Sequence, residues 1–238
     1  MSTRIAMWSG PRNLSTAMMR AFENRADTSV VDEPFYACYL AASGEDHPMT
    51  AEVIASQSTD WGVVAEQLTS ARLDTALQYQ KQMTHHMLPG VDIGFCRQLK
   101  NAFLIRHPRD VVRSYLNKRD AVTADDIGIN RQWALYQEIA ELSETAVPVI
   151  DSEDVLRDPR RALTVLCAAL DIEFDDAMLE WPAGRRDSDG VWAPHWYQSV
   201  EASTGFEPWR ERDRTFAHPA IDDSMASFEA LAAVRLRL

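Results

Sequence analysis

The stretch from Ser9 to Thr16 has the residues of an anion-binding turn. It follows a β-rich run, Arg4–Trp8, and a helical pattern begins within it at Leu14. A strand that enters a helix through a glycine turn directs several free N–H groups to one point, and the helix dipole adds partial positive charge there. We therefore expect a phosphate- or sulfate-binding loop, formed by Gly10, Pro11, Arg12, Asn13, Leu14, Ser15 and Thr16.

The same loop lacks the residues with which P-loop enzymes hold magnesium. Counting from Gly10, Ser15 stands where that pattern has its second glycine, and Thr16 stands where it has lysine. Ala17 occupies the position of the magnesium-binding hydroxyl. We therefore expect a group transfer that uses no metal at this loop.

A second candidate anion site lies near Arg106. This residue follows the apolar run Ala102–Ile105, and Ser114 lies in the helical pattern that begins at Asp110. Ligands of open α/β sheets bind beyond the carboxyl ends of the strands. An arginine fork with a hydroxyl at that edge is suited to a second phosphate.

Taken together, the two stretches resemble the sulfotransferase family, whose donor is 3′-phosphoadenosine 5′-phosphosulfate. The run Pro11–Thr16 is similar to the family's PRSGT-type loop, with Leu14 in place of the glycine. The family's 3′-phosphate motif is close to RNPxDxxxSxY, and it is matched here by Arg106, Pro108, Asp110, Ser114 and Tyr115. A later family feature is echoed by Ser152–Pro159. The resemblance implies an α/β fold related to P-loop NTPases, with a parallel sheet flanked by helices and one domain over residues 1–238.

The resemblance also implies how the donor binds. Arg12, Ser15 and Thr16 would bind its 5′ side, and Arg106 with Ser114 would hold the 3′-phosphate. The product would be adenosine 3′,5′-bisphosphate.

The segment from Gly184 to Trp192 is similar in order to a late arginine loop of the family. In the family this loop closes over the 3′-phosphate, which implies the same role for Arg185 and Arg186. The aromatic residues that follow, Trp196 and Tyr197, either stack on the adenine, line the acceptor pocket or pack on the domain.

Two residues compete for the role of general base. Glu33 follows the strand-like run Ser29–Asp32, and carbohydrate-type sulfotransferases have a similar Glu-Pro whose glutamate is the base. In the cytosolic branch of the family the base is a histidine after a lysine, and His85 follows Lys81 here. The resemblance favours Glu33, leaves His85 as the alternative and implies that Lys81 lies near the sulfate. Asp32 is a further alternative acid, because neighbours on a strand face opposite sides.

These residues need a scaffold that alternates strands and helices, as in a parallel sheet covered by helices. The strand-like runs are Arg4–Trp8, Ser29–Asp32, Tyr79–Met83, Ala102–Ile105 and Val147–Ile150. Helical patterns begin at Leu14 and Asp110, and others cover Trp61–Leu77, Asn130–Ser143 and Asp158–Leu170. Asp158-Pro159 is a typical helix start, with Asp at the N-cap and Pro at the first turn.

The composition is that of a globular protein, with 46% hydrophobic and 25% charged residues among 238. A net charge of −12 argues against nucleic-acid or membrane-surface binding. We expect a cytoplasmic protein, because no apolar run has the roughly 18–20 residues of a membrane helix and the first residues do not form a secretory signal. We expect the three cysteines, Cys38, Cys96 and Cys167, to be reduced and structural.

The sequence therefore favours a sulfotransferase that acts on a hydroxyl or amine of a small-molecule acceptor. The alternatives are a non-catalytic nucleotide-binding protein on the same fold and a P-loop phosphotransferase, which would need magnesium. A homodimer is compatible with the sequence. The acceptor pocket, or an aromatic cage for a quaternary amine, would be lined by Trp8, Phe35, Tyr36 and Tyr39.

Overall fold

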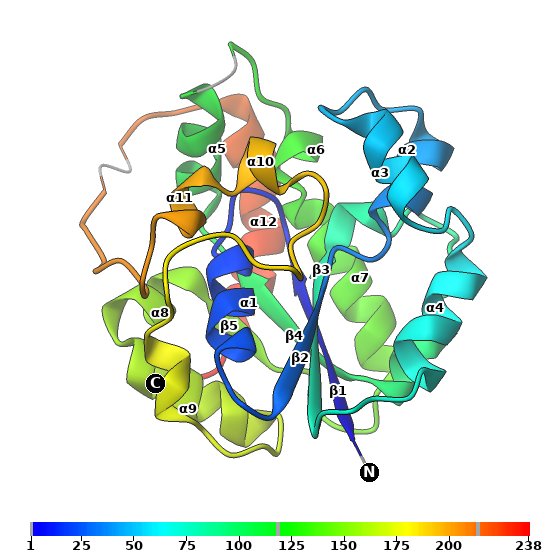
Figure 1. Ribbon diagram of the computed structural model, residues 1–238. Coiled ribbons are helices and arrows are strands. Elements are labelled where there is room, and N and C mark those ends of the chain that lie inside the picture. The colour runs from blue at the N-terminus through cyan, green and yellow to red at the C-terminus, as the bar shows by residue number, and fades with distance from the viewer. Residues whose placement is uncertain (1, 118–119, 213–214) are drawn as a thin grey trace.

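A five-stranded parallel sheet forms the centre of the molecule (Figure 1). The computed structural model describes residues 2–117, 120–212 and 215–238. The strands are β1 Thr3–Ser9, β2 Thr28–Asp32, β3 Leu77–Met83, β4 Lys100–Ile105 and β5 Val149–Asp151. Their order in the sheet is β2-β3-β1-β4-β5.

The order of the strands reverses its direction at β1. The chain places β2 and β3 on one side of this strand and then crosses to β4 and β5 on the other. A crevice opens outside the carboxyl ends of the strands where such a reversal occurs, and ligands of α/β proteins bind there. The loops that follow β1, β2, β3 and β4 all begin at this edge, which lies at the upper end of Figure 1.

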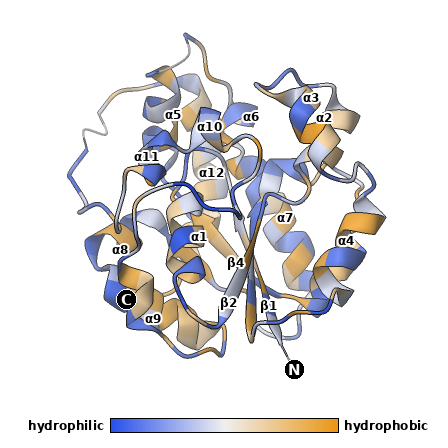
Figure 2. Ribbon diagram, in the orientation of Figure 1, coloured by the Kyte–Doolittle hydropathy of each residue, from blue (hydrophilic) through white to orange (hydrophobic). Residues whose placement is uncertain are grey.

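Helices cover both faces of the sheet. The α-helices are α1 Ser15–Glu23, α2 Tyr36–Ser43, α3 Thr50–Ser56, α4 Trp61–Ser70, α5 Pro108–Leu116, α6 Ala124–Ile127, α7 Ile129–Leu142, α8 Ser152–Arg157, α9 Pro159–Ala169, α10 Ala193–Trp196, α11 Gln198–Glu201 and α12 Pro219–Ala233. Three short 3₁₀ helices are η1 Thr84–His86, η2 Gly94–Gln98 and η3 Asp176–Leu179. In Figure 2 helices such as α4 and α9 carry both hydrophobic and hydrophilic residues, as amphipathic surface helices do.

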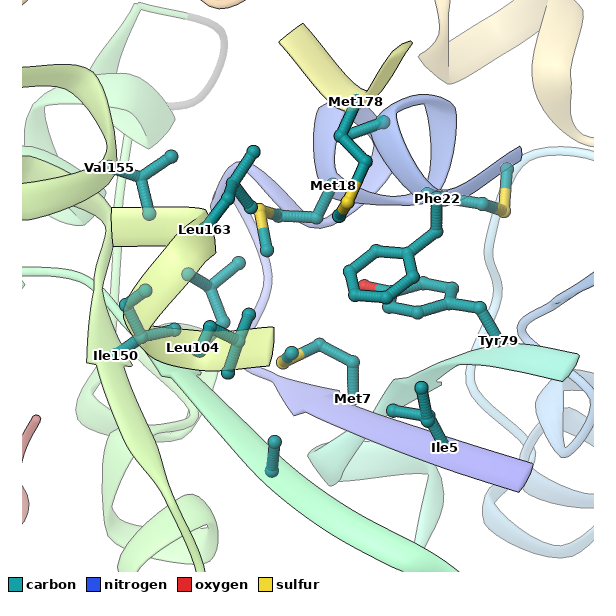
Figure 3. Packing of buried hydrophobic residues seen from close by; sticks show 14 of the residues in the cluster. Ile5, Met7, Met18, Phe22, Tyr79, Leu104, Ile150, Val155, Leu163 and Met178 are labelled. Carbon is teal, nitrogen blue, oxygen red and sulfur yellow. The ribbon is translucent and has the colours of Figure 1, made fainter. Parts of the chain in front are cut away.

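The alternation of side chains along β1 divides the core into two layers. Ile5 and Met7 point into the layer covered by α1 and α9, whereas Ala6 and Trp8 point into the layer covered by α4, α7 and α12. Figure 3 shows the first layer, in which Phe22 stacks on Tyr79 with 4.3 Å between the ring centres. Both faces of the central strands are therefore covered.

Two predicted boundaries were wrong. The predicted helix Trp61–Leu77 ends at Ser70, because Leu77 already pairs with Thr3 and Thr28 in the sheet. The strand expected at Val147–Ile150 begins only at Val149. Pro148 has no N–H to donate to the ladder, although its carbonyl accepts from the Phe103 N–H at 2.9 Å.

The three cysteines are free and buried, as predicted. Within the described residues, no helix combines the length and the apolar character that crossing a bilayer requires.

Candidate active site

A cavity of about 600 Å³ lies at the carboxyl edge of the sheet. The predicted site residues that line it are Pro11, Arg12, Asn13, Ser15, Thr16, Glu33, Lys81 and His85. The remaining lining residues are Tyr36, Tyr39, Glu45, Asp46, His47, Met83, His86, Tyr115, Thr123, Asp125, Asp126, Trp196 and Tyr197. The fold thus brings the first anion loop and both candidate bases to one space.

The loop after β1 presents the start of α1 to this cavity. The helix has no side-chain N-cap, so its first N–H groups are left for a ligand. Asn13 fixes the loop to β4, because its Nδ2 donates to the Leu104 carbonyl at 2.9 Å. Arg12 has a φ of 55°, a left-handed conformation that costs a non-glycine residue about 1–3 kcal/mol and is typical of functional sites.

Gly10 and Leu14 have structural tasks in the same loop. A Cβ on Gly10 would lie 3.3 Å from the Ile127 carbonyl, so glycine allows α6 to approach closely. The side chain of Leu14 packs against the core on the α1 face. The leucine that replaces the family's glycine is therefore accommodated by the core and does not line the cavity.

Arginines from distant segments meet beside the loop. Arg12 Nε donates to Ser114 Oγ at 3.0 Å, and Arg106 Nη1 donates to the Arg12 carbonyl. Burial, together with the positive charges of Arg212 and Arg12, lowers the pKa of Arg106 to about 10. Arg212 Nη1 also lies 3.9 Å from Asp110 Oδ1. The result is a concentration of positive charge in a chain whose net charge is −12.

The structure does not bring Arg185 and Arg186 to this cluster. Arg186 Nε lies 3.7 Å from Glu23 Oε2, at the far end of α1, and its Nη2 donates to the Pro182 carbonyl. Arg185 is exposed on the same segment. Among the described residues of the C-terminal part of the chain, Arg212 is an arginine whose charge acts on Arg106, and the sequence motifs did not identify it.

Lys81 is the centre of a buried polar cluster. Its Nζ donates to Asp32 Oδ1 at 2.9 Å and to Glu33 Oε1 at 2.5 Å, although the residue is only 1% exposed. Burial opposes its charge, but the two carboxylates raise the pKa of the Lys81 ammonium above 10.5 and keep it protonated. Lys81 therefore lies beside Glu33, and it lines the same cavity as the candidate anion loop.

Tyr197 closes this cluster from the C-terminal segment. Its hydroxyl donates to Asp32 at 2.7 Å and accepts from Lys81 Nζ and from Trp192 Nε1. The hydroxyl thus uses its one proton and both lone pairs. Asp32 also accepts from the Gly190 N–H at 3.1 Å. Asp32 is engaged in holding Lys81 and the 190–197 segment, so Glu33 is the carboxylate of this cluster that lines the cavity.

The backbone and the surroundings of Glu33 set its properties. Its φ is 42°, and its N–H donates to the Lys81 carbonyl, so the residue turns sharply away from β2. Burial raises the pKa of the Glu33 carboxyl above its usual 4.5; Lys81 opposes the rise and Asp32 adds to it. A carboxylate with a raised pKa is a stronger proton acceptor.

The two histidines are neutral. Burial is the main cause that lowers the pKa of His85 to about 3 and that of His86 well below 6.5. His86 Nε2 lies 3.9 Å from Glu33 Oε2. His85 lines the same cavity, so the geometry keeps both candidates, but its low pKa makes this imidazole a weak base.

The predicted acceptor aromatics divide into two pairs. Tyr36 and Tyr39 line the cavity, as do Trp196 and Tyr197. Trp8 and Phe35 do not, because both are buried in the core on the α4 face.

The fold and the site together define an α/β protein with a candidate anion site at the carboxyl edge of its sheet. The sequence model of the family described as "Sulfotransferase domain" matches residues 3–230. The chain belongs to the sulfotransferase domain family.

Curated relatives have a different name. The chain is 36% identical over 212 residues to branched-chain-amino-acid aminotransferase-like protein 1 of Arabidopsis thaliana, and 32% identical over 212 residues to protein 2 of the same name and organism. Each match covers 89% of this chain but 38% of the relative. The chain therefore spans less than half the length of the curated relatives it matches.

Two solved structures have a similar fold. The sulfotransferase domain of the Synechococcus PCC 7002 olefin synthase matches with a TM-score of 0.54 at 18% identity, over 100% of this chain and 96% of that chain. A sulfotransferase from Alicyclobacillus acidocaldarius matches with a TM-score of 0.53 at 11% identity, over 99% of this chain and 98% of that chain. The predicted fold class is confirmed.

Proposed function

We propose that this chain transfers a sulfuryl group from 3′-phosphoadenosine 5′-phosphosulfate to a hydroxyl or amine of a small molecule. One observation carries the proposal. The Arg12–Ser114–Arg106 cluster and the Glu33–Lys81 pair are each held together by hydrogen bonds, and Arg12, Glu33 and Lys81 line one cavity. Anion binding and proton removal are the two tasks that this reaction requires.

The donor would bind along the arginine cluster. Arg12, the hydroxyls of Ser15 and Thr16 and the first N–H groups of α1 are suited to the 5′-phosphosulfate. Arg106 and Ser114 are suited to the 3′-phosphate, and we add Arg212, because its charge reaches Arg106. Arg186 is held by Glu23, so we assign it no direct contact with the donor.

The chemical step would use Glu33 and Lys81. An oxygen of the acceptor attacks the sulfur, and the bond from sulfur to the bridging phosphate oxygen breaks. The Glu33 carboxylate takes the proton of the acceptor hydroxyl, while Arg12 and the amides of α1 stabilise the charge that develops on the departing phosphate. Lys81 holds Glu33 in place through its short hydrogen bond.

A titration of the product nucleotide tests the donor site without an acceptor. We expect adenosine 3′,5′-bisphosphate to raise the melting temperature in EDTA, because the site is made of arginines and amides. At about 100 times the dissociation constant the gain in stability should be roughly 2.7 kcal/mol. A shift that appears only with ATP and Mg²⁺ would indicate a phosphotransferase instead.

A further inference from the structure

The part of the cavity beyond Glu33, here called the acceptor end, combines aromatic rings with carboxylates. Its aromatic members are Tyr36, Tyr39, His47, His85, His86 and Trp196. Its acidic members are Glu45, Asp46, Asp125 and Asp126. Glu45 and Asp46 follow α2, and Asp125 and Asp126 belong to α6; both helices lie at the upper end of Figure 1.

The rings of the acceptor end form one packed group. Tyr36 and Tyr39 both stack on His86, with ring centres 4.6 and 5.1 Å away. His86 is only 2% exposed, and its Nδ1 has no hydrogen-bond partner within the described part of the chain. His85 Nδ1 is likewise buried without a partner among the described residues, so the site offers electron-rich tyrosine rings and two unpaired imidazole nitrogens.

The carboxylates of the acceptor end are close enough to these rings to raise the pKa of a tyrosine. Burial raises the pKa of the Tyr39 hydroxyl, and the negative charges of Glu45 and Asp126 raise it further, so the segment after α2 and the helix α6 each bring a carboxylate near this ring. The basic side chains among the described lining residues are Arg12 and Lys81. Arg12 is hydrogen-bonded to Ser114, and Lys81 to Asp32 and Glu33, so within the described residues neither of these cations is paired with Glu45 or Asp46.

We infer that the acceptor is a small molecule with a positively charged amine next to the hydroxyl that receives the sulfuryl group. The inference rests on the proposed function. A cation would lie against the faces of Tyr36 and Tyr39, between the carboxylates of α2 and α6. The bound donor is itself an anion, so it adds to the field that attracts a cation and repels an anionic acceptor.

Acceptors that differ in charge alone test the inference. Tyramine, 4-ethylphenol and 3-(4-hydroxyphenyl)propanoate present the same phenol with a cationic, neutral or anionic side chain. Choline and 3,3-dimethylbutan-1-ol form a second pair with an aliphatic hydroxyl. In at least one series, kcat/KM for the cation should exceed that for the neutral compound by about 2–30-fold, the range of a cation–π contact. The anionic compound should be the poorest of its series.

Variants that remove the charges of Glu45 and Asp46 test whether these carboxylates cause the preference for a cationic acceptor. Glu45→Gln with Asp46→Asn should raise KM for the cation by about threefold to tenfold, as expected for two partly screened charges, and leave KM for the neutral compound unchanged. Glu52→Gln is the matched control, because Glu52 is exposed on α3, close in sequence, and does not line the cavity. Tyramine can also be titrated by calorimetry into the unmodified protein and each variant, saturated with adenosine 3′,5′-bisphosphate. The affinities should follow the same order without turnover.

The outcomes separate this inference from the proposed function. Preferred use of the neutral or anionic compounds overturns the inference while sulfuryl transfer stands. If the bisphosphate binds but neither cation is bound or sulfated, the inference is also overturned. Failure to bind the bisphosphate and to sulfate any compound would instead reject the proposed function.

Discussion

The proton affinity of the Glu33 carboxylate, the proposed base, is set by Lys81, by Asp32 and by burial. Lys81 holds the carboxylate at 2.5 Å, Asp32 supplies a second negative charge beside it, and the surrounding protein removes water. Burial dominates, so the pKa of Glu33 is above 4.5. Because its pKa is raised, the Glu33 carboxylate binds a proton more readily than the carboxylate of an exposed glutamate.

The acid limb of the pH–rate profile distinguishes the two candidate bases. A base must be deprotonated to act, so activity falls as the pH drops through its pKa. With Glu33 as the base, the midpoint of the acid limb in kcat/KM should lie above pH 4.5, because its pKa is raised. The measurement is kcat/KM between pH 4 and 8 in a constant-ionic-strength buffer. A rate that stays level down to about pH 4 would favour His85, whose pKa is about 3.

Tyr197 positions the base through Asp32 and Lys81. Replacement by phenylalanine removes a hydroxyl that serves three partners, and leaving buried polar groups unpaired costs about 1–3 kcal/mol for each group. We expect Tyr197→Phe to lower kcat and to lower the free energy of unfolding. Tyr197 also lowers the pKa of Glu33, so the acid limb should move to higher pH in this variant. A loss of stability with an unmoved acid limb would mean that Tyr197 serves the fold alone.

At the scale of elements, the two strand-to-helix connections after β1 and β4 meet at the proposed anion site. Their positions were predictable, because glycine, arginine and hydroxyl residues stand between an apolar run and a helical pattern. The sequence also placed Glu33 correctly at the end of β2 and on the cavity wall. Local patterns were sufficient here, because each feature lies at the end of one strand.

Contacts between distant segments could not be predicted in this way. The Tyr197 hydroxyl donates to Asp32, which lies 165 positions away in the sequence. Arg212, which lies near Asp110, belongs to a segment without regular secondary structure. Arg186 was matched to a family loop by its place in the sequence, but its side chain lies beside Glu23 at the far end of α1. Arg212 stands in the alternating run Arg210–Arg214 of basic and acidic residues, so no sequence signal distinguished it from the arginines beside it.

Three arginine variants test which segment completes the donor site. Arg106→Ala should weaken adenosine 3′,5′-bisphosphate by about 10–100-fold and hardly affect adenosine 5′-phosphate, because a charge-assisted hydrogen bond is worth about 1.5–3 kcal/mol. Arg212→Gln should have the same selectivity with a smaller loss, about threefold to tenfold, since the side chain is 35% exposed. Arg186→Gln is the comparison and should leave both affinities unchanged. Calorimetric titration measures all three, and the assignment is reversed if Arg186 matters and Arg212 does not.

For the whole molecule, the parallel sheet and its two helical layers explain why an acidic chain has a basic site. The strand order reverses at β1, so the connections after β1 and β4 deliver Arg12 and Arg106 to the same crevice. Most of the negative charge lies elsewhere on the surface or on the acceptor end. The fold class followed from the sequence, whereas the segregation of charge within the cavity emerged only from the assembled chain.

A single-turnover assay tests the central claim most directly. The protein is saturated with donor that carries a ³⁵S label, mixed with the acceptor series above, and the labelled products are separated over time. We predict that labelled sulfate moves to an acceptor, and that Glu33→Gln slows this step by about 10²–10⁴-fold while its affinity for adenosine 3′,5′-bisphosphate is retained. Absence of labelled product from the unmodified protein, with the bisphosphate bound, would contradict the account and leave a nucleotide-binding protein without catalysis.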